Sequence, residues 1–85
     1  MVQVIGEQVA VLSRFSSTGR FEPVRMKWRN HSVRVREVTG RWDRHDGQFK
    51  IYHFALVGEG DSFYEVTFHT RDMAWRLEKM ALDQA

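Results

Sequence analysis

Hydrophobic and polar residues alternate in several short runs through the middle of the chain, over residues 24–68. This period of two predicts β-strands that bury one face and expose the other to water. The apolar positions of these runs are Val24, Met26, Trp28, Val33, Val35, Tyr52, Phe54, Leu56, Tyr64, Val66 and Phe68. Turn-forming residues separate the runs at Asn30 and His31, at 43–47 and at 58–61. We therefore expect a meander of four antiparallel strands in this region.

Both ends of the chain continue the pattern less regularly. A further strand is expected before the loop at residues 16–19, with apolar positions at Val9, Val11 and Phe15. The last segment admits two structures, because residues 74–85 are rich in helix formers although Trp75 and Leu77 keep the strand alternation. We expect a strand over 74–79, followed by a short helix or a frayed end.

These elements predict an all-β fold of five or six antiparallel strands, curled into a small barrel or half-barrel. A chain of 85 residues is one domain, so residues 1–85 are expected to form a single small β domain. The expected cross-strand partners are Trp28 with Val33 and Met26 with Val35 in the first hairpin, Val38 with Tyr52 and Val35 with Phe54 in the second, and Leu56 with Tyr64 in the third.

The second hairpin requires an irregularity. Val33 and Val35 occupy odd positions, whereas Val38 and Trp42 occupy even ones. One strand cannot turn all four side chains inward unless it contains an extra residue. We therefore predict a β-bulge near Arg36 and the residue after it, which would also bend the strand towards a barrel.

Basic residues are concentrated in the middle of the chain. Residues 20–50 contain nine Lys and Arg against four Asp and Glu, whereas residues 51–85 contain three against six, although the net charge of the whole chain is only +2. This asymmetry indicates either two regions that attract each other in the fold or a face that binds anions.

The basic side chains alternate with the apolar ones, so they are expected to share the outer face of the sheet. The expected register places Lys27 opposite Arg34 and Arg25 opposite Arg36, and like charges in such positions destabilise a sheet. Internal carboxylates could offset this repulsion, and so could an external polyanion such as a phosphate backbone. The candidate polyanion-binding residues are Arg25, Lys27, Arg29, Arg34, Arg36 and Arg41.

Exposed aromatic rings are the second requirement for binding single-stranded nucleic acid, because they provide surfaces on which bases stack. Most aromatic residues of this chain are needed for the core. The aromatic residues that the pattern leaves for the surface are Phe21, Trp42, Phe49 and Phe63.

No catalytic apparatus is recognisable. The chain has no cysteine, no serine in a nucleophile motif and no glycine-rich phosphate loop. The expected register places His53, His69 and Glu65 near one another, but surface histidines are far commoner than metal ligands. We expect no enzymatic activity, no cofactor and no metal.

The chain also lacks a long apolar segment and an N-terminal signal peptide, so no membrane partner is expected. Together with the absence of cysteine, this predicts a cytoplasmic protein.

Short motifs between Pro23 and Glu78 are similar to those of one family. They are PVRMKWR at 23–29, HSVRVREV at 31–38, Trp42, FYEV at 63–66 and WRLE at 75–78. Here the chain resembles a family of small uncharacterised bacterial domains that occur alone or attached to lesion-bypass (Y-family) DNA polymerases. The resemblance implies a strand around Trp75 and favours contact with nucleic acid, and it implies no catalytic residues.

The sequence thus predicts a non-enzymatic binding module that contacts nucleic acid or another polyanion through a basic sheet face. The alternative is a protein-interaction or self-assembly module that uses a sheet edge.

Overall fold

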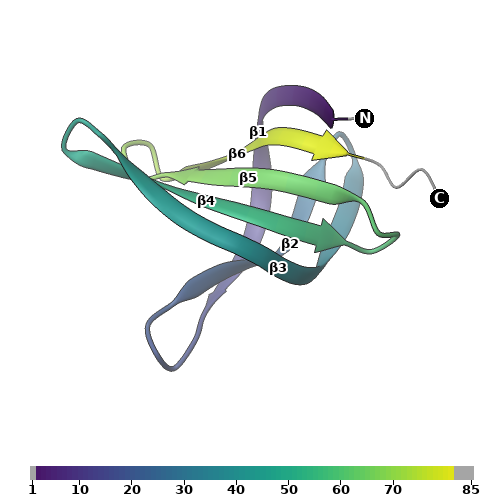
Figure 1. The fold of residues 1–85 in the computed structure, drawn as a ribbon, viewed down its shortest axis with the longest axis horizontal. Coiled ribbons are helices and arrows are strands. Elements are labelled where there is room, and N and C mark those ends of the chain that lie inside the picture. Colours follow the sequence, from purple (N-terminus) through teal and green to yellow (C-terminus); the bar gives the residue numbers. More distant parts are fainter. Residues whose placement is uncertain (1, 82–85) are drawn as a thin grey trace.

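Six antiparallel strands, joined in order as a meander, make up the fold (Figure 1). The computed structural model describes residues 2–81. The strands are β1 (Val2–Phe15), β2 (Phe21–Trp28), β3 (His31–Asp46), β4 (Phe49–Gly58), β5 (Phe63–His69) and β6 (Ala74–Ala81). β1 pairs with β6 as well as with β2, which closes the sheet into a ring. The prediction of an all-β, curled antiparallel meander is confirmed, and residues 2–81 include no helix that could span a membrane.

The strand predicted over residues 74–79 is present as β6. Its alternation prevails over its helix propensity because Trp75 and Leu77 are both buried in the core, on one face of the strand. The helix or frayed end expected beyond Lys79 is not found at residues 80–81, which still belong to β6. The rest of that expectation falls on residues 82–85, outside the described range.

The core lies inside the ring and consists of side chains from alternate strand positions. The side chains at its centre, each no more than 1% exposed, include Met26, Leu56, Val66 and Leu77. Phe21 adds a ring that contacts five other aromatic rings at centroid distances of 5.1–6.1 Å. The predicted register of the β4–β5 hairpin is confirmed, with Leu56 opposite Tyr64.

The predicted register of the β2–β3 hairpin is wrong by two residues. Met26, rather than Trp28, lies opposite Val33. The turn is formed by Arg29 and Asn30, both in the left-handed region with φ of 49° and 65°. A two-residue turn with two positive φ angles matches the right-handed twist of the strands that it joins. A shift of two keeps each side chain on its predicted face but changes its partner across the hairpin.

β3 contains the predicted bulge at Arg36 and a second one at Thr39. The predicted partners across β3 and β4 are wrong: Val38 lies opposite Leu56 rather than Tyr52, and Val35 opposite Gly58 rather than Phe54. The reason is that β3 continues through most of the polar segment that was predicted to be a turn. Because that segment is exposed throughout, it carries no hydrophobic alternation.

The ring is uneven because β2 and β3 pair only near their shared turn. The ladder between them ends at Arg25 opposite Arg34. Beyond this point β2 pairs only with β1, and β3 pairs only with β4. We call the resulting opening the β2–β3 split; its margins are residues 21–24 of β2 and 35–46 of β3. In Figure 1 the β1–β2 and β3–β4 hairpins project from the body of the molecule as two separate arms.

Candidate polyanion-binding site

Two neighbouring grooves follow the β2–β3 split. The first has a volume of about 310 Å³, and its basic lining residues are Arg14, Arg25, Arg34 and Arg36. The second has a volume of about 370 Å³, and its basic lining residues are Arg20 and Arg41. The carboxylates that line the two grooves are Glu22, Glu37 and Asp43. The split therefore has twice as many guanidinium groups as carboxylates.

Arg25 and Arg34 are the two predicted binding residues that the structure places directly opposite each other. Both are exposed, and neither forms an ion pair with another residue of the described chain. The predicted pairing of Lys27 with Arg34 is wrong, since Lys27 lies opposite Ser32, as is the pairing of Arg25 with Arg36. Arg25 also donates a hydrogen bond from Nη1 to Ser32 Oγ at 3.2 Å.

Internal carboxylates neutralise the other three predicted arginines. The ion pairs are Arg29 with Glu7, Arg36 with Asp61, and Arg41 with Glu22. Arg29 lies in the β2–β3 turn and lines neither groove, so the structure separates it from the split. Lys27 is exposed on β2 and also lines neither groove.

Glu22 joins the two margins of the split. Its Oε1 accepts a hydrogen bond from Nη2 of Arg14 at 2.8 Å, and its Oε2 accepts one from Nη2 of Arg41 at 3.0 Å. The bonds from Arg14 and then from Arg41 lower the pKa of the Glu22 carboxyl. Glu22 therefore remains ionised near neutral pH and holds β1, β2 and β3 together where β2 and β3 no longer pair.

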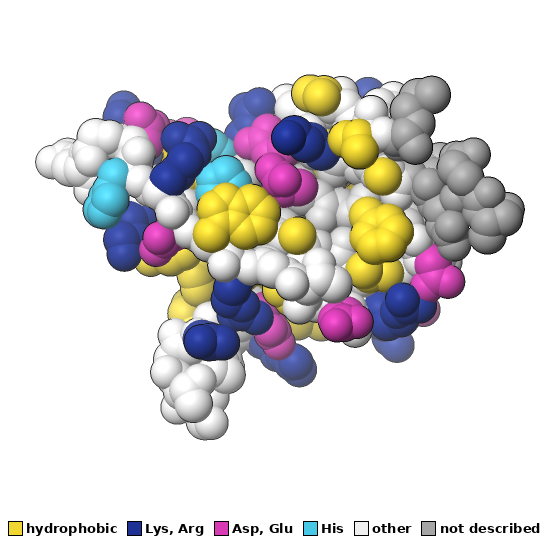
Figure 2. Space-filling view, viewed as in Figure 1, with side chains coloured by type: hydrophobic (Ala, Val, Ile, Leu, Met, Phe, Trp, Pro, Cys, Tyr) yellow, Lys and Arg dark blue, Asp and Glu magenta, His cyan; other side chains and the backbone are white. Residues whose placement is uncertain are grey.

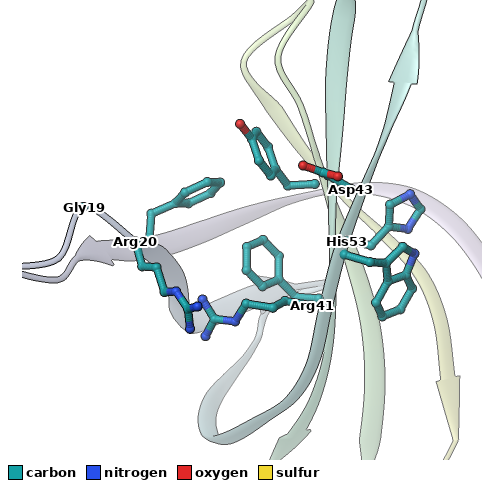
Figure 3. A pocket seen from close by; sticks show the side chains of 9 residues that line it. Gly19, Arg20, Arg41, Asp43 and His53 are labelled. Carbon is teal, nitrogen blue, oxygen red and sulfur yellow. The ribbon is translucent and has the colours of Figure 1, made fainter.

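Arg20 and Arg41 point towards each other across the second groove (Figure 3). Arg41 also lies over the ring of Phe54, at 5.8 Å from its centroid. Figure 2 shows Lys and Arg side chains on both sides of the notch between the projecting hairpins. Converging guanidinium groups suit a phosphate, because each can donate two parallel hydrogen bonds to its oxygens.

Of the four aromatic residues predicted for the surface, Trp42 is the one that reaches the split and is also exposed. Its exposed fraction is 46%, and it lines the second groove. Phe21 lines the same groove but packs into the aromatic core. Phe63 is 52% exposed and lines neither groove. Phe49 is partly buried, with the guanidinium of Arg71 over its ring.

The sequence-based prediction missed Arg14 and Arg20. Arg14 and Leu12 occupy alternate, exposed positions of β1. Extending the period-two pattern through β1 would therefore have predicted that Arg14 lies on the outer face. It lies opposite Glu22 in the β1–β2 ladder. Arg20 directly precedes β2 in a loop, and no periodic signal marks its direction.

The histidines and Glu65 do not form a metal site. The predicted pairings of His53 with Thr67 and of His69 with Ile51 are present. Nevertheless, residues 2–81 contain no group of three or more His, Asp or Glu side chains arranged to hold a metal ion.

Glu7 holds the β2–β3 turn against β1. Its carboxylate accepts hydrogen bonds from Arg29 and, at 2.9 Å, from Nε1 of Trp28. These bonds, with Arg29 contributing most, lower the pKa of Glu7 below its ordinary value of 4.5. The contact therefore stabilises the folded state fully above that ordinary value, and the stabilisation is lost as the pH falls through the lower folded-state pKa.

We expect Glu7→Gln to reduce the acid sensitivity of the fold. The variant should be less stable than the wild type at about pH 7, and the difference should shrink at about pH 3, below the ordinary value of 4.5, as a growing fraction of Glu7 is protonated and the contact is lost. Urea denaturation at the two pH values measures this. Glu59→Gln, at an exposed turn position, is the matched control. A Glu7→Gln deficit that is equal at both pH values would contradict the expectation.

The split thus combines a basic lining, two unneutralised facing arginines and one exposed indole.

Comparison of the chain with protein-family models, with curated proteins and with solved structures finds no match in any of the three.

Proposed function

We propose that the protein is a non-enzymatic binding module that holds a polyanion, the phosphate backbone of a nucleic acid, along the β2–β3 split. The observation that carries this proposal is the set of six arginines around the two grooves, against three carboxylates. A nucleic acid presents a regular row of phosphates, and arginine binds each of them by charge and by paired hydrogen bonds.

The Arg25–Arg34 pair supports this proposal because neither guanidinium has a carboxylate partner among residues 2–81. Directly opposed residues on antiparallel strands have Cβ atoms about 5 Å apart, and like charges at that distance destabilise the sheet. A phosphate bound over both guanidinium groups would remove this repulsion. Arg20, and the nitrogens of Arg41 other than the Nη2 that bonds to Glu22, provide further donors along the split (Figure 3).

The proposal predicts oligonucleotide binding that weakens steeply with salt. If four arginines contact phosphates of a single strand, the logarithm of the binding constant should fall with the logarithm of salt concentration with a slope of about −3. Affinity should then drop about 50-fold between about 50 and 200 mM salt. Fluorescence anisotropy with labelled single- and double-stranded oligonucleotides measures the slope. Absent binding, or binding that salt does not change, would remove the proposal.

The free edge of β3 supports a second candidate, the binding of a partner strand. Residues 35–46 of β3 pair on one side only, and such an edge can accept an extended peptide. Charged side chains along the same edge, among them Arg36, Arg41 and Asp43, discourage addition of a second copy of this chain. Light scattering at several protein concentrations tests self-assembly: a mass that increases with concentration supports it, and a constant monomer mass excludes it.

A further inference from the structure

Trp42 exposes a large aromatic ring at the β3 margin of the second groove, on the face of the strand opposite to Arg41, since Trp42 stacks on His53 whereas Arg41 lies over Phe54. Its exposed fraction is 46%, and the same groove is lined by Arg20 and Arg41. By contrast, Trp75 is buried in the core and Trp28 packs against it. A ring of this size that stays in water on the unpaired margin of β3 offers an apolar surface to a ligand that passes over this margin from the arginines of the groove.

The indole of Trp42 packs against His53. One face stacks on the imidazole of His53, with ring centroids 5.1 Å apart and an interplanar angle of 15°. Gly40 lies beside the ring, since a Cβ at that position would be in van der Waals contact with Cζ3 of Trp42, at 3.7 Å. Because the ring is already ordered, a second flat ring could stack on its open face with little loss of side-chain entropy.

His53 supports the indole as a neutral ring. Its Nε2 accepts a hydrogen bond of 3.1 Å from Nε of Arg44. Burial lowers the pKa of His53, and the charge of Arg44 lowers it further, so the imidazole is uncharged near pH 7. His53 therefore provides no charge for a phosphate. At this end of the groove, the Trp42–His53 pair offers a stacking surface while the arginines offer charge.

We infer that the polyanion is single-stranded nucleic acid, with its phosphates on the arginines of the split and one unpaired base stacked on Trp42. Sequence-independent single-strand binding generally combines these two features, a basic groove and an aromatic platform. In a duplex the faces of the bases are already covered by their neighbours, so a duplex could offer phosphates but no free base. The inference rests on the proposed function and specifies the class of its ligand.

Substitution of Trp42 tests the inference. Trp42→Ala should weaken binding of a single-stranded oligonucleotide about tenfold, as expected for the loss of one stacked base, whereas Trp42→Phe should retain most of the affinity. Duplex binding and the salt slope should not change, because no phosphate contact is lost. Phe63→Ala removes a ring that is slightly more exposed than Trp42 and lies outside both grooves, so it should leave single-strand binding unaltered.

Tryptophan fluorescence provides a second measurement. A base on Trp42 should quench part of the emission of the wild-type protein, and the quenching should disappear in Trp42→Phe, which retains the other two tryptophans. Quenching that persists in this variant would overturn the inference, as would equal losses of single-strand and duplex binding in Trp42→Ala. Salt-dependent binding of both nucleic acids that Trp42→Ala leaves unchanged would overturn only this inference, whereas absent binding would remove the proposed function as well.

Discussion

Reversal of both Arg25 and Arg34 to Glu should weaken oligonucleotide binding about 100-fold at low salt and reduce the salt slope by about 1.4. These arginines lie directly opposite each other on β2 and β3 and have no carboxylate partner among residues 2–81. The double variant replaces one pair of like charges by another, so the stability of the fold should change little. Anisotropy titrations at several salt concentrations, with urea denaturation alongside, measure both effects.

The matched control reverses Arg71 and Lys79, which line neither groove, and gives the same change in net charge. It should retain most of the affinity. Equal losses in the two double variants would mean that net charge, rather than the split, drives binding. The single change Arg34→Glu separates the two roles further: it creates an opposite-charge pair with Arg25, so it should raise the free energy of unfolding by about 0.2–1 kcal/mol while it weakens binding.

Gly58→Ala should be the most destabilising small substitution in the fold. Gly58 lies at the end of β4, opposite Val35, where the backbone of β4 passes close to the core. A Cβ there would stand 2.6 Å from Cγ1 of Val33 and 3.0 Å from Cε2 of Tyr64, which is closer than van der Waals contact allows. Overpacking of this kind costs about 1–3 kcal/mol, and the melting temperature should fall by about 5–20 °C.

Gly40→Ala is the matched control for this substitution. Gly40 also lies on a strand, and its added methyl group would meet only ordinary contacts, at 3.7 Å from Ala55 and Trp42. Its effect should remain within about 0.5 kcal/mol, as for most substitutions away from strained positions. Thermal unfolding followed by circular dichroism compares the two variants. Similar melting temperatures for both would show that the side chains around Gly58 can move aside.

Hydrophobic alternation predicted most of the fold because each strand buries one face in a common core. The β4–β5 register followed from Tyr64 and Leu56, which are both buried. The β2–β3 turn was misplaced because arginine rarely adopts a positive φ, so nothing in the sequence marked Arg29 as a turn residue. The error was two residues, which preserved the outward direction of the basic side chains but not their pairing.

The split itself was beyond prediction from the sequence. Its existence depends on where two strands stop pairing, and hydrophobic alternation is the same in a paired and an unpaired strand margin. Arg41 illustrates the difficulty: sequence placed it on a continuous basic face, whereas the bulge at Thr39 and the long β3 direct it across the opening to Glu22. A contact between residues as far apart in the chain as Glu22 and Arg41 leaves no pattern in the local sequence from which it could be predicted.

Val2 pairs with Ala81, so the polypeptide enters and leaves the sheet at one place. In Figure 1 this place lies at the upper right, away from the tip of the β3–β4 hairpin at the left and the tip of the β1–β2 hairpin at the bottom. Chain segments that precede Val2 or follow Ala81 would therefore leave the sheet on the side away from the β2–β3 split. A domain attached through such a segment could then leave the split accessible to a ligand.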